Sequence, residues 1–154
     1  GVTTVVAKLF NATQPDKAYF GQKDAQQAAV IRQMTRDLNF PIEIVVCPIV
    51  READGLAMSS RNKYLEGADR KAATILFRAL SAAKEMYETG ERNGEKLRGK
   101  MKEALESEPR AQMQYVSCAD YDTLEELAVI KGKTLLSMAV FLGKTRLIDN
   151  FVLG

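Results

Sequence analysis

The feature that most constrains the fold of this sequence is a strand–helix–strand pattern between residues 18 and 47. Ala18 to Phe20 has the composition of a short strand, and apolar residues recur at helical spacing from Ala25 to about Leu38. Ile42 to Cys47 is a β-branched run that a proline precedes and another closes. Such a pattern within about 30 residues predicts a βαβ unit with two parallel strands.

Two parallel strands form too small a sheet to stand alone, since parallel sheets are normally larger and covered on both faces. A helix is expected before the first strand, and its apolar face comprises Val2, Val5, Val6, Leu9 and Phe10. The face expected on the second helix comprises Val30, Ile31, Met34 and Leu38. We therefore expect the chain to begin inside a larger doubly wound sheet whose earlier strands it lacks. The alternative is a small α+β fold in which the first helix packs elsewhere.

The passage from strand to helix at Tyr19–Gln27 carries a candidate phosphate site. Gly21 predicts a turn that lets a ligand approach the backbone, and Lys23 adds a mobile positive charge. Asp24 is expected to cap the helix, with Gln27 completing a capping box three residues later. The N–H groups at such a helix start favour anions. An ordinary strand-to-helix turn with an exposed lysine is the alternative interpretation.

A second candidate segment, Val50–Asn62, follows the second strand and contains an Asp-Gly turn signal. Ser59, Ser60 and Arg61 place two hydroxyls and a guanidinium side by side, and these groups bind phosphate oxygens. Ligands of open α/β sheets lie beyond the carboxyl ends of the strands, so we expect both candidate segments to face one nucleotide. A solvated loop is the alternative for the Ser-Ser-Arg run.

Composition excludes several classes of function. The chain has no histidine, which rules out Ser–His or Cys–His nucleophile pairs and imidazole metal ligands within it. Carboxylates are scattered, so we expect no metal site of the protein's own. A net charge of +2 from interspersed residues argues against nucleic-acid binding, and no apolar run is long enough to span a membrane. Cys47 and Cys118 are expected to be buried free thiols in a reducing, cytoplasmic compartment.

The rest of the chain predicts a small α+β lobe with helical cover over a three-stranded antiparallel sheet. Helices are predicted at about Asp69–Thr89, Gly94–Ser107 and Thr123–Leu127. Strands are predicted at Met113–Ala119, Thr134–Leu142 and Arg146–Val152. The buried helical positions are expected to be Ile75, Leu76, Leu80, Ala83, Tyr87, Leu97, Met101 and Leu105. Tyr115 and Phe141 are expected in the core rather than at a ligand.

Four motifs together resemble the pantothenate synthetase (pantoate–β-alanine ligase) family. They are Phe20-Gly21-Gln22-Lys23-Asp24 with Gln26-Gln27, Cys47-Pro48-Ile49-Val50-Arg51, the segment from Asp54 to Asn62, and Arg146-Leu147-Ile148-Asp149-Asn150. The resemblance runs along the whole chain, in order. It implies an α/β fold in which residues 1–49 form the last βαβ portion of a Rossmann-like nucleotidyltransferase domain. Residues 50–154 would then form a C-terminal α+β lobe that covers the active site.

The resemblance also implies an activity and its site. The family condenses pantoate with β-alanine at the expense of ATP, through a pantoyl-adenylate, in coenzyme A biosynthesis. ATP contacts are implied at Gly21, Gln22, Lys23, Asp24, Val50, Met58, Ser59, Ser60 and Arg61. Lys23, Ser59, Ser60 and Arg61 would be the catalytic set that stabilises charge on the phosphates, and Gln27 would bind pantoate. Mg²⁺ would accompany ATP as co-substrate, and a homodimer is expected.

This chain departs from the family pattern in two places. Gln22 stands where glutamate is commoner, a change of little consequence if the contact is made by the backbone. The His-x-Gly-His motif is absent because the chain has no histidine. We therefore expect a C-terminal portion of the enzyme that has no ligase activity by itself. The alternatives are another adenylyl-transferring enzyme and a non-enzymatic assembly or dimerisation piece.

Overall fold

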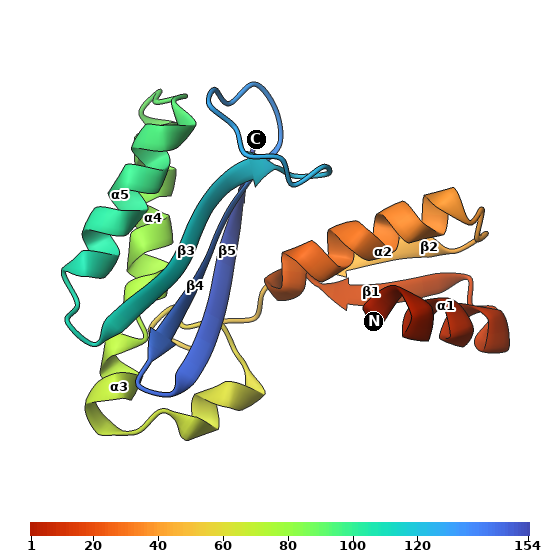
Figure 1. The fold of residues 1–154 in the computed structure, drawn as a ribbon, viewed down its shortest axis with the longest axis horizontal. Coiled ribbons are helices and arrows are strands. Elements are labelled where there is room, and N and C mark those ends of the chain that lie inside the picture. Colours follow the sequence, from red (N-terminus) through yellow and green to blue (C-terminus); the bar gives the residue numbers. More distant parts are fainter. The chain divides into compact units, whose positions relative to one another are not determined.

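The structure is a computed structural model that describes all of residues 1–154. It divides into two compact units, Gly1–Ile49 and Val50–Gly154 (Figure 1). Each unit has its own hydrophobic core. One contains a two-stranded parallel sheet and the other a three-stranded antiparallel sheet, which confirms the α/β class and both sheet types. None of the helices combines the length and the apolarity that crossing a membrane requires.

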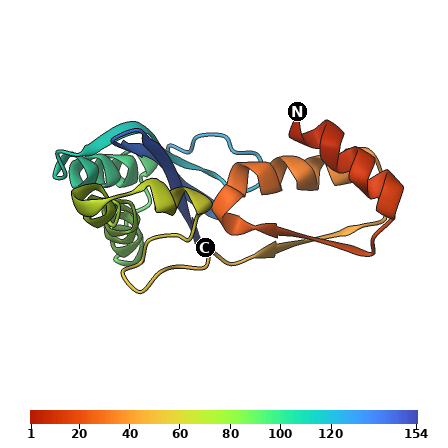
Figure 2. The same ribbon diagram turned by 90° about the horizontal axis from the view of Figure 1, so that it is seen from below.

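The first unit is built on the predicted βαβ pattern. Its elements are α1 (Val2–Thr13), β1 (Lys17–Gly21), the 3₁₀ turn η1 (Gln22–Asp24), α2 (Ala25–Asp37) and β2 (Glu43–Cys47). The strands pair in parallel, from Lys17 opposite Glu43 to Gly21 opposite Cys47. Figure 2 shows α1 and α2 on the same side of this strand pair. The predicted parallel strand–helix–strand unit is therefore confirmed.

The core of this unit is small and centred on Phe10, Ile31 and Met34. The ring of Phe10 meets that of Phe40 edge-to-face, with 5.6 Å between centroids. Apolar side chains of both strands complete it, among them Ala18 and Phe20 of β1.

The predicted apolar faces of the two helices were partly wrong. Val2, Val5 and Leu9 of α1, together with Val30 and Leu38 around α2, are exposed. The buried face of α2 instead follows Ala28, Ile31 and Thr35, because the alanines allow close packing against the strands and α1. Val30 lies off that stripe, and Leu38 lies beyond the last helical residue.

The second unit is a three-stranded sheet with two helices against it. Its elements are η2 (Ser60–Tyr64), α3 (Gly67–Ala72), α4 (Ile75–Glu88), α5 (Gly94–Glu106), β3 (Ala111–Asp120), β4 (Thr134–Leu142) and β5 (Thr145–Leu153). The strands are antiparallel in the order β3-β4-β5. Helices α4 and α5 lie together on one face of the sheet in both views (Figures 1 and 2). The predicted three-stranded antiparallel sheet is confirmed.

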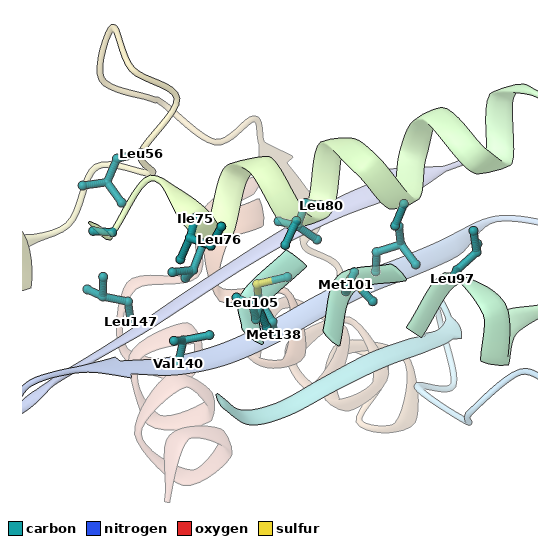
Figure 3. Packing of buried hydrophobic residues seen from close by; sticks show 14 of the residues in the cluster. Leu56, Ile75, Leu76, Leu80, Leu97, Met101, Leu105, Met138, Val140 and Leu147 are labelled. Atoms are coloured by element: carbon teal, nitrogen blue, oxygen red, sulfur yellow. The ribbon is translucent and has the colours of Figure 1, made fainter. Parts of the chain in front are cut away.

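The core of the second unit lies between these helices and the sheet (Figure 3). Leu76 and Leu80 of α4 and Met101 of α5 are fully buried, as the helical spacing predicted. They pack on β4, where Met138 and Val140 are equally inaccessible. Because β4 is the central strand and most of its residues are buried, it is the axis of this lobe.

The predicted long helix at Asp69–Thr89 is wrong, since it is two helices with a break at Ala73 and Thr74. The hydroxyl of Thr74 donates to the carbonyl of Lys71 at 2.9 Å, and the N–H of Leu76 bonds the carbonyl of Ala73 at 3.3 Å. These short-range bonds tighten the chain at the break and replace the regular helical pattern.

The predicted helix at Thr123–Leu127 is also wrong, because this segment is a loop at the edge of β3. The carboxylate of Asp120 accepts the backbone N–H groups of Asp122 and Thr123, both at 2.9 Å. The loop then bonds the strand edge, where the N–H of Leu127 reaches the carbonyl of Cys118 at 2.9 Å. Side-chain capping of a turn has outcompeted helix formation here.

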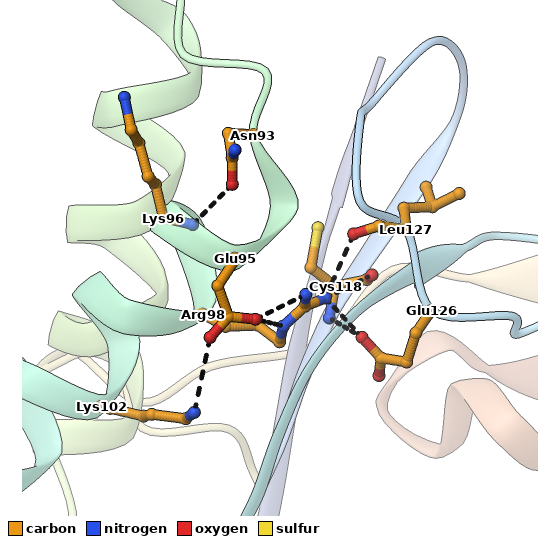
Figure 4. Close-up of polar contacts among 8 residues, drawn as sticks. All are labelled: Asn93, Glu95, Lys96, Arg98, Lys102, Cys118, Glu126 and Leu127. Carbon is orange, nitrogen blue, oxygen red and sulfur yellow. Dashed lines mark hydrogen bonds and ion pairs between the residues drawn. The ribbon is translucent and has the colours of Figure 1, made fainter.

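Arg98 joins α5 to that loop (Figure 4). Its guanidinium donates to the carboxylate of Glu95 at 2.8 and 2.9 Å, to that of Glu126 at 2.6 Å and to the carbonyl of Leu127 at 3.2 Å. The helix that covers the sheet is thus tied to the loop that borders it.

Four predictions of burial need correction. Tyr87, predicted in the buried face of the helix, is only half-buried and packs against the core from outside it. Tyr115 is 41% exposed because it lies on the edge strand β3, and Phe141 is half-buried. Cys118 is fully buried as predicted, whereas Cys47 is only half-buried because it ends β2. Both cysteines are free thiols.

Candidate functional site

The first candidate segment differs in geometry from its prediction. Gly21 ends β1 in an extended conformation, with φ −78° and ψ 133°, so it is not a turn residue. The turn is made by η1, and Asp24 stands at the N-cap of α2 without a side-chain capping bond. The predicted capping box with Gln27 is therefore wrong, because the preceding 3₁₀ turn changes how the chain enters the helix.

This segment nevertheless offers space and charge. A Cβ built at Gly21 would meet no atom within 4 Å, so the backbone there is open to a ligand. The ammonium of Lys23 lies 3.9 Å from the carboxylate of Asp24, and the side chain of Lys23 is only 18% exposed. Gln22 is half-buried and Gln27 is exposed at the start of α2.

The second candidate segment opens as a small closed hairpin. Arg51 and Ala57 form an isolated antiparallel β-bridge, and the N–H of Met58 donates to the carbonyl of Val50 at 2.9 Å. Gly55 turns the chain with φ +90°, and a Cβ at this position would collide with the ring of Phe77. The predicted Asp-Gly turn is confirmed, and it demands glycine for both reasons.

The segment Ser59–Arg61, which carries the two hydroxyls and the guanidinium, follows the hairpin directly. Ser59 caps η2, since its hydroxyl accepts the N–H of Arg61 at 3.2 Å. Ser60 and Arg61 are exposed, as are the side chains of Val50 and Met58. The hydroxyl of Ser59 thus has a structural task, while the groups best placed to meet an anion are those of Ser60 and Arg61.

A network that sequence reasoning missed holds this segment in shape. Arg70 of α3 donates to the carboxylates of Glu52 at 2.6 Å and Asp54 at 2.7 Å. The amide of Asn62 donates to Glu52 at 2.8 Å and to the carbonyl of Ala57 at 3.1 Å. Hydrogen bonds from Asn62 and then from Arg70 lower the pKa of Glu52, and the bond from Arg70 lowers the pKa of Asp54. The only sequence signal for this network is the local density of opposite charges.

A second anchor, also missed, is the contact of Arg51 with Asp149 of β5. The guanidinium donates to both carboxylate oxygens, at 2.7 and 2.9 Å, and to the carbonyl of Gly55 at 2.9 Å. Leu56 is buried in the core beside these contacts. The hairpin that carries Val50 and Met58 is therefore fixed to the sheet of its own unit.

Neither segment provides a metal cage. The structure contains no group of three or more Cys, Asp or Glu side chains placed to hold a metal ion. What the segments offer are cations, hydroxyls and open backbone, which are partners for an anionic ligand. Each of the two belongs to its own compact unit.

Comparison with known proteins gives these segments a family. The family model described as pantoate-beta-alanine ligase matches residues 1–152. The pantothenate synthetase of Roseiflexus castenholzii is 61% identical over 153 residues, which are 99% of this chain and 55% of that protein. The pantothenate synthetase of Caldicellulosiruptor saccharolyticus is 58% identical over 152 residues, which are 99% and 54%.

Solved structures of the same family also match this chain. A pantothenate synthetase crystal structure from Thermus thermophilus matches 97% of this chain and 54% of its own, with a TM-score of 0.92 and 43% identity. A pantoate-beta-alanine ligase from Francisella tularensis, complexed with beta-gamma ATP and β-alanine, matches 99% and 49%, with a TM-score of 0.66 and 32% identity. The chain thus spans about half the length of the relatives it matches. The resemblance found in the motifs is confirmed, and the chain belongs to the pantoate-beta-alanine ligase family.

Proposed function

We propose that this chain is a working part of an AMP-forming ligase that condenses pantoate with β-alanine to pantothenate, using ATP. The observation that carries this proposal is the family match over residues 1–152. The complex of the Francisella tularensis relative with beta-gamma ATP and β-alanine supports the same two substrates here.

In this proposal the ATP phosphates meet two groups of residues. Lys23 supplies one cation, and the open backbone at Gly21, with Gln22 and Asp24 beside it, supplies close approach. The exposed Ser60 and Arg61 supply a hydroxyl and a guanidinium. Ser59 acts by shaping this turn as well as through its own hydroxyl, because it caps η2.

The remaining contacts are assigned by the same family pattern. Val50 would meet the adenine through its backbone, and Met58 would border the nucleotide. The hydrogen bond from the Met58 N–H to the Val50 carbonyl keeps both residues at one end of the hairpin. Gln27, exposed on the first turn of α2, would donate its amide to pantoate.

The reaction needs charge stabilisation more than a nucleophilic side chain. A carboxylate oxygen of pantoate forms a bond to the α-phosphorus of ATP as the bond to pyrophosphate breaks, which gives pantoyl-adenylate. The amine of β-alanine then attacks the acyl carbon and AMP departs. Negative charge grows on phosphoryl oxygens, where preplaced cations and N–H groups lower the barrier. Magnesium bound to ATP would neutralise part of that charge, and the phosphates rather than a carboxylate cage would hold it.

We also propose that the 154-residue chain forms no pantothenate by itself. It contains no histidine, whereas the family pattern includes a His-x-Gly-His motif. The check is incubation of the purified chain with pantoate, β-alanine and Mg-ATP, followed by mass spectrometry. Pantothenate above the no-enzyme blank would overturn this part of the proposal.

The activity itself is tested with a chimera, in which the chain replaces the residues it aligns with in the Roseiflexus castenholzii protein. At 61% identity the graft is expected to fold and to form pantothenate, AMP and pyrophosphate in equal amounts. Lys23→Ala in the chimera is expected to reduce kcat/KM by roughly two orders of magnitude, while Lys17→Ala, in an exposed ion pair with Glu43, leaves it unchanged. A chimera with a native circular dichroism spectrum but no ATP-dependent product would refute the proposal.

A second candidate function, self-association as a homodimer, is favoured by one observation. The first unit has an open groove of about 510 Å³ between α1 and α2, bordered by Ala7, Val30, Met34 and Leu38. Apolar surface of this kind commonly marks an interface. Light scattering is expected to give a dimer mass that Leu38→Asp abolishes and that Val129→Asp, at another exposed apolar position, preserves. A monomeric parent chain would exclude this candidate.

A further inference from the structure

A basic cavity lies beside the β4–β5 hairpin, within the second unit. Its volume is about 680 Å³, enough for a small-molecule ligand. In Figure 1 the hairpin tip lies near α3, and the lining residues come from both elements and from η2. They are Arg61, Tyr64, Asp69, Leu142, Gly143, Lys144, Thr145 and Arg146.

Cations dominate this cavity. Arg61, Lys144 and Arg146 border it, and no ion pair joins any of the three to a carboxylate. Arg146 is held by Gln114, whose side-chain oxygen accepts from its Nε at 2.7 Å, so its other guanidinium nitrogens remain available as donors.

The single carboxylate in the lining, Asp69, is already neutralised. Its Oδ1 accepts from the guanidinium of Arg110 at 2.8 Å. Three cations therefore face the cavity against one carboxylate that has its own partner, and the local charge is strongly positive.

The hairpin tip is set in place by a close contact. Gly143 has φ +56°, and a Cβ at this position would lie 3.0 Å from Oδ2 of Asp69. Glycine thus lets the tip pack against α3 and brings the following residue, Lys144, to the cavity edge. Arg146 lies on β5 and Lys144 in the two-residue turn that joins β4 to β5, so a tight hairpin rather than a long free loop positions both cations.

We infer that Arg61, Lys144 and Arg146 form a binding site for a diphosphate or triphosphate group. Guanidinium groups match phosphate oxygens in a fixed fork, and a lysine adds a point charge. The inference rests on the proposed function through Arg61, which would contact ATP phosphates there. It adds Lys144 and Arg146 as phosphate-recognition residues, at positions 83 and 85 residues beyond Arg61 in the sequence. The cavity lies wholly within the second unit, so the 154-residue chain can be tested directly.

The test is isothermal titration calorimetry of the 154-residue chain with sodium pyrophosphate at low ionic strength. Lys144→Gln and Arg146→Gln are each expected to weaken binding roughly tenfold, as loss of one charge-assisted contact does. Lys131→Gln is the matched control, because Lys131 is also exposed but lies before β4 rather than after it. Higher salt is expected to weaken binding by the parent chain.

The outcomes separate this inference from the proposed function. A folded parent chain that does not bind pyrophosphate at about millimolar concentration, or Lys144 and Arg146 variants that bind it as the parent does, overturns the inference. If the two substitutions weaken the binding of ATP as much as that of pyrophosphate, the site receives the phosphates of the nucleotide. If they weaken the binding of pyrophosphate alone, the site holds the released product. The binding of AMP should be unaffected by either substitution. An inactive chimera with intact pyrophosphate binding would refute the ligase and leave the anion site standing.

Discussion

The guanidinium of Arg51 meets both carboxylate oxygens of Asp149, at 2.7 and 2.9 Å, across 98 positions of sequence. Its central carbon also lies 5.0 Å from the ring centroid of Phe77 and 5.1 Å from that of Phe151. The Asp149 side chain is 1% exposed and that of Arg51 is 18% exposed. One buried, aromatic-lined ion pair therefore joins the start of the proposed nucleotide hairpin to the last strand of the sheet.

Removing Arg51 should be costly because it leaves the buried charge of Asp149 without a partner. We expect Arg51→Ala to lower the free energy of unfolding of the second unit by about 3–5 kcal/mol, measured by urea denaturation. Arg51→Lys should recover only part of the loss, since an ammonium cannot reproduce the two-pronged contact. Lys100→Ala, which breaks an exposed pair with Glu103, should cost under about 1 kcal/mol. Equal losses for Arg51→Ala and Lys100→Ala would contradict this assignment.

Two glycines of the same helix make a matched pair. Gly94, the first residue of α5, is buried against the Leu127 carbonyl, and an added Cβ would collide with that oxygen. Gly99, one turn further, is exposed with nothing within 4 Å of such a Cβ. Gly94→Ala should destabilise the chain by about 1–3 kcal/mol, and Gly99→Ala should stabilise it by about 0.5–1 kcal/mol. Thermal unfolding of both variants tests the prediction, which is wrong if the two shifts share a sign.

The network of Arg70 should give part of the stability a pH dependence. In the folded chain the pKa values of Glu52 and Asp54 lie below their ordinary values. A depressed carboxyl pKa contributes stability above the unfolded pKa, and that contribution is lost as pH falls through the folded pKa. Parent chain and Arg70→Gln should therefore differ in melting temperature above about pH 5, and the difference should shrink below about pH 4. A difference that persists undiminished in strong acid would show that the network does not act through these carboxylates.

The two thiols should differ in reactivity. Burial raises the pKa of Cys118 to about 11, so almost no thiolate forms at this residue near neutral pH. Cys47 is half-buried. Titration with Ellman's reagent at about pH 8 should show one fast thiol in the parent chain and none in Cys47→Ser, with Cys118 reacting only after urea is added. Rapid labelling of Cys118 in native buffer would mean that the β3 edge opens readily.

Strong periodic patterns were read correctly from the sequence. The strand β4 was predicted with the bounds that the structure shows, Thr134–Leu142, because its apolar run is long and broken only by Ser137. In α5 the three predicted core positions, Leu97, Met101 and Leu105, are all buried. In both segments the regular element that the pattern predicts also buries the apolar residues of that pattern.

Elsewhere, local hydrogen bonds gave a structure that differs from the one the sequence pattern predicted. The loop after Asp120 satisfies its backbone through one carboxylate and the edge of β3, so the predicted helix at Thr123–Leu127 does not form. Gly21 was predicted to be in a turn but is the last residue of β1, because the turn is made by the 3₁₀ segment that follows Gly21. Both outcomes depend on a choice among hydrogen-bond partners of similar strength, which composition does not decide.

The sequence by itself determined the βαβ unit, the three-stranded sheet and the presence of a glycine–lysine segment and a Ser-Ser-Arg segment, because these follow from periodicity and from residues adjacent in the chain. Only the tertiary structure decided what holds the second segment: Arg51 with Asp149, and Arg70 with Glu52 and Asp54. It also decided that Lys144 and Arg146 line a cavity with Arg61. Charged side chains have many possible partners along a chain, and only the packed backbone brings a particular pair within hydrogen-bonding distance.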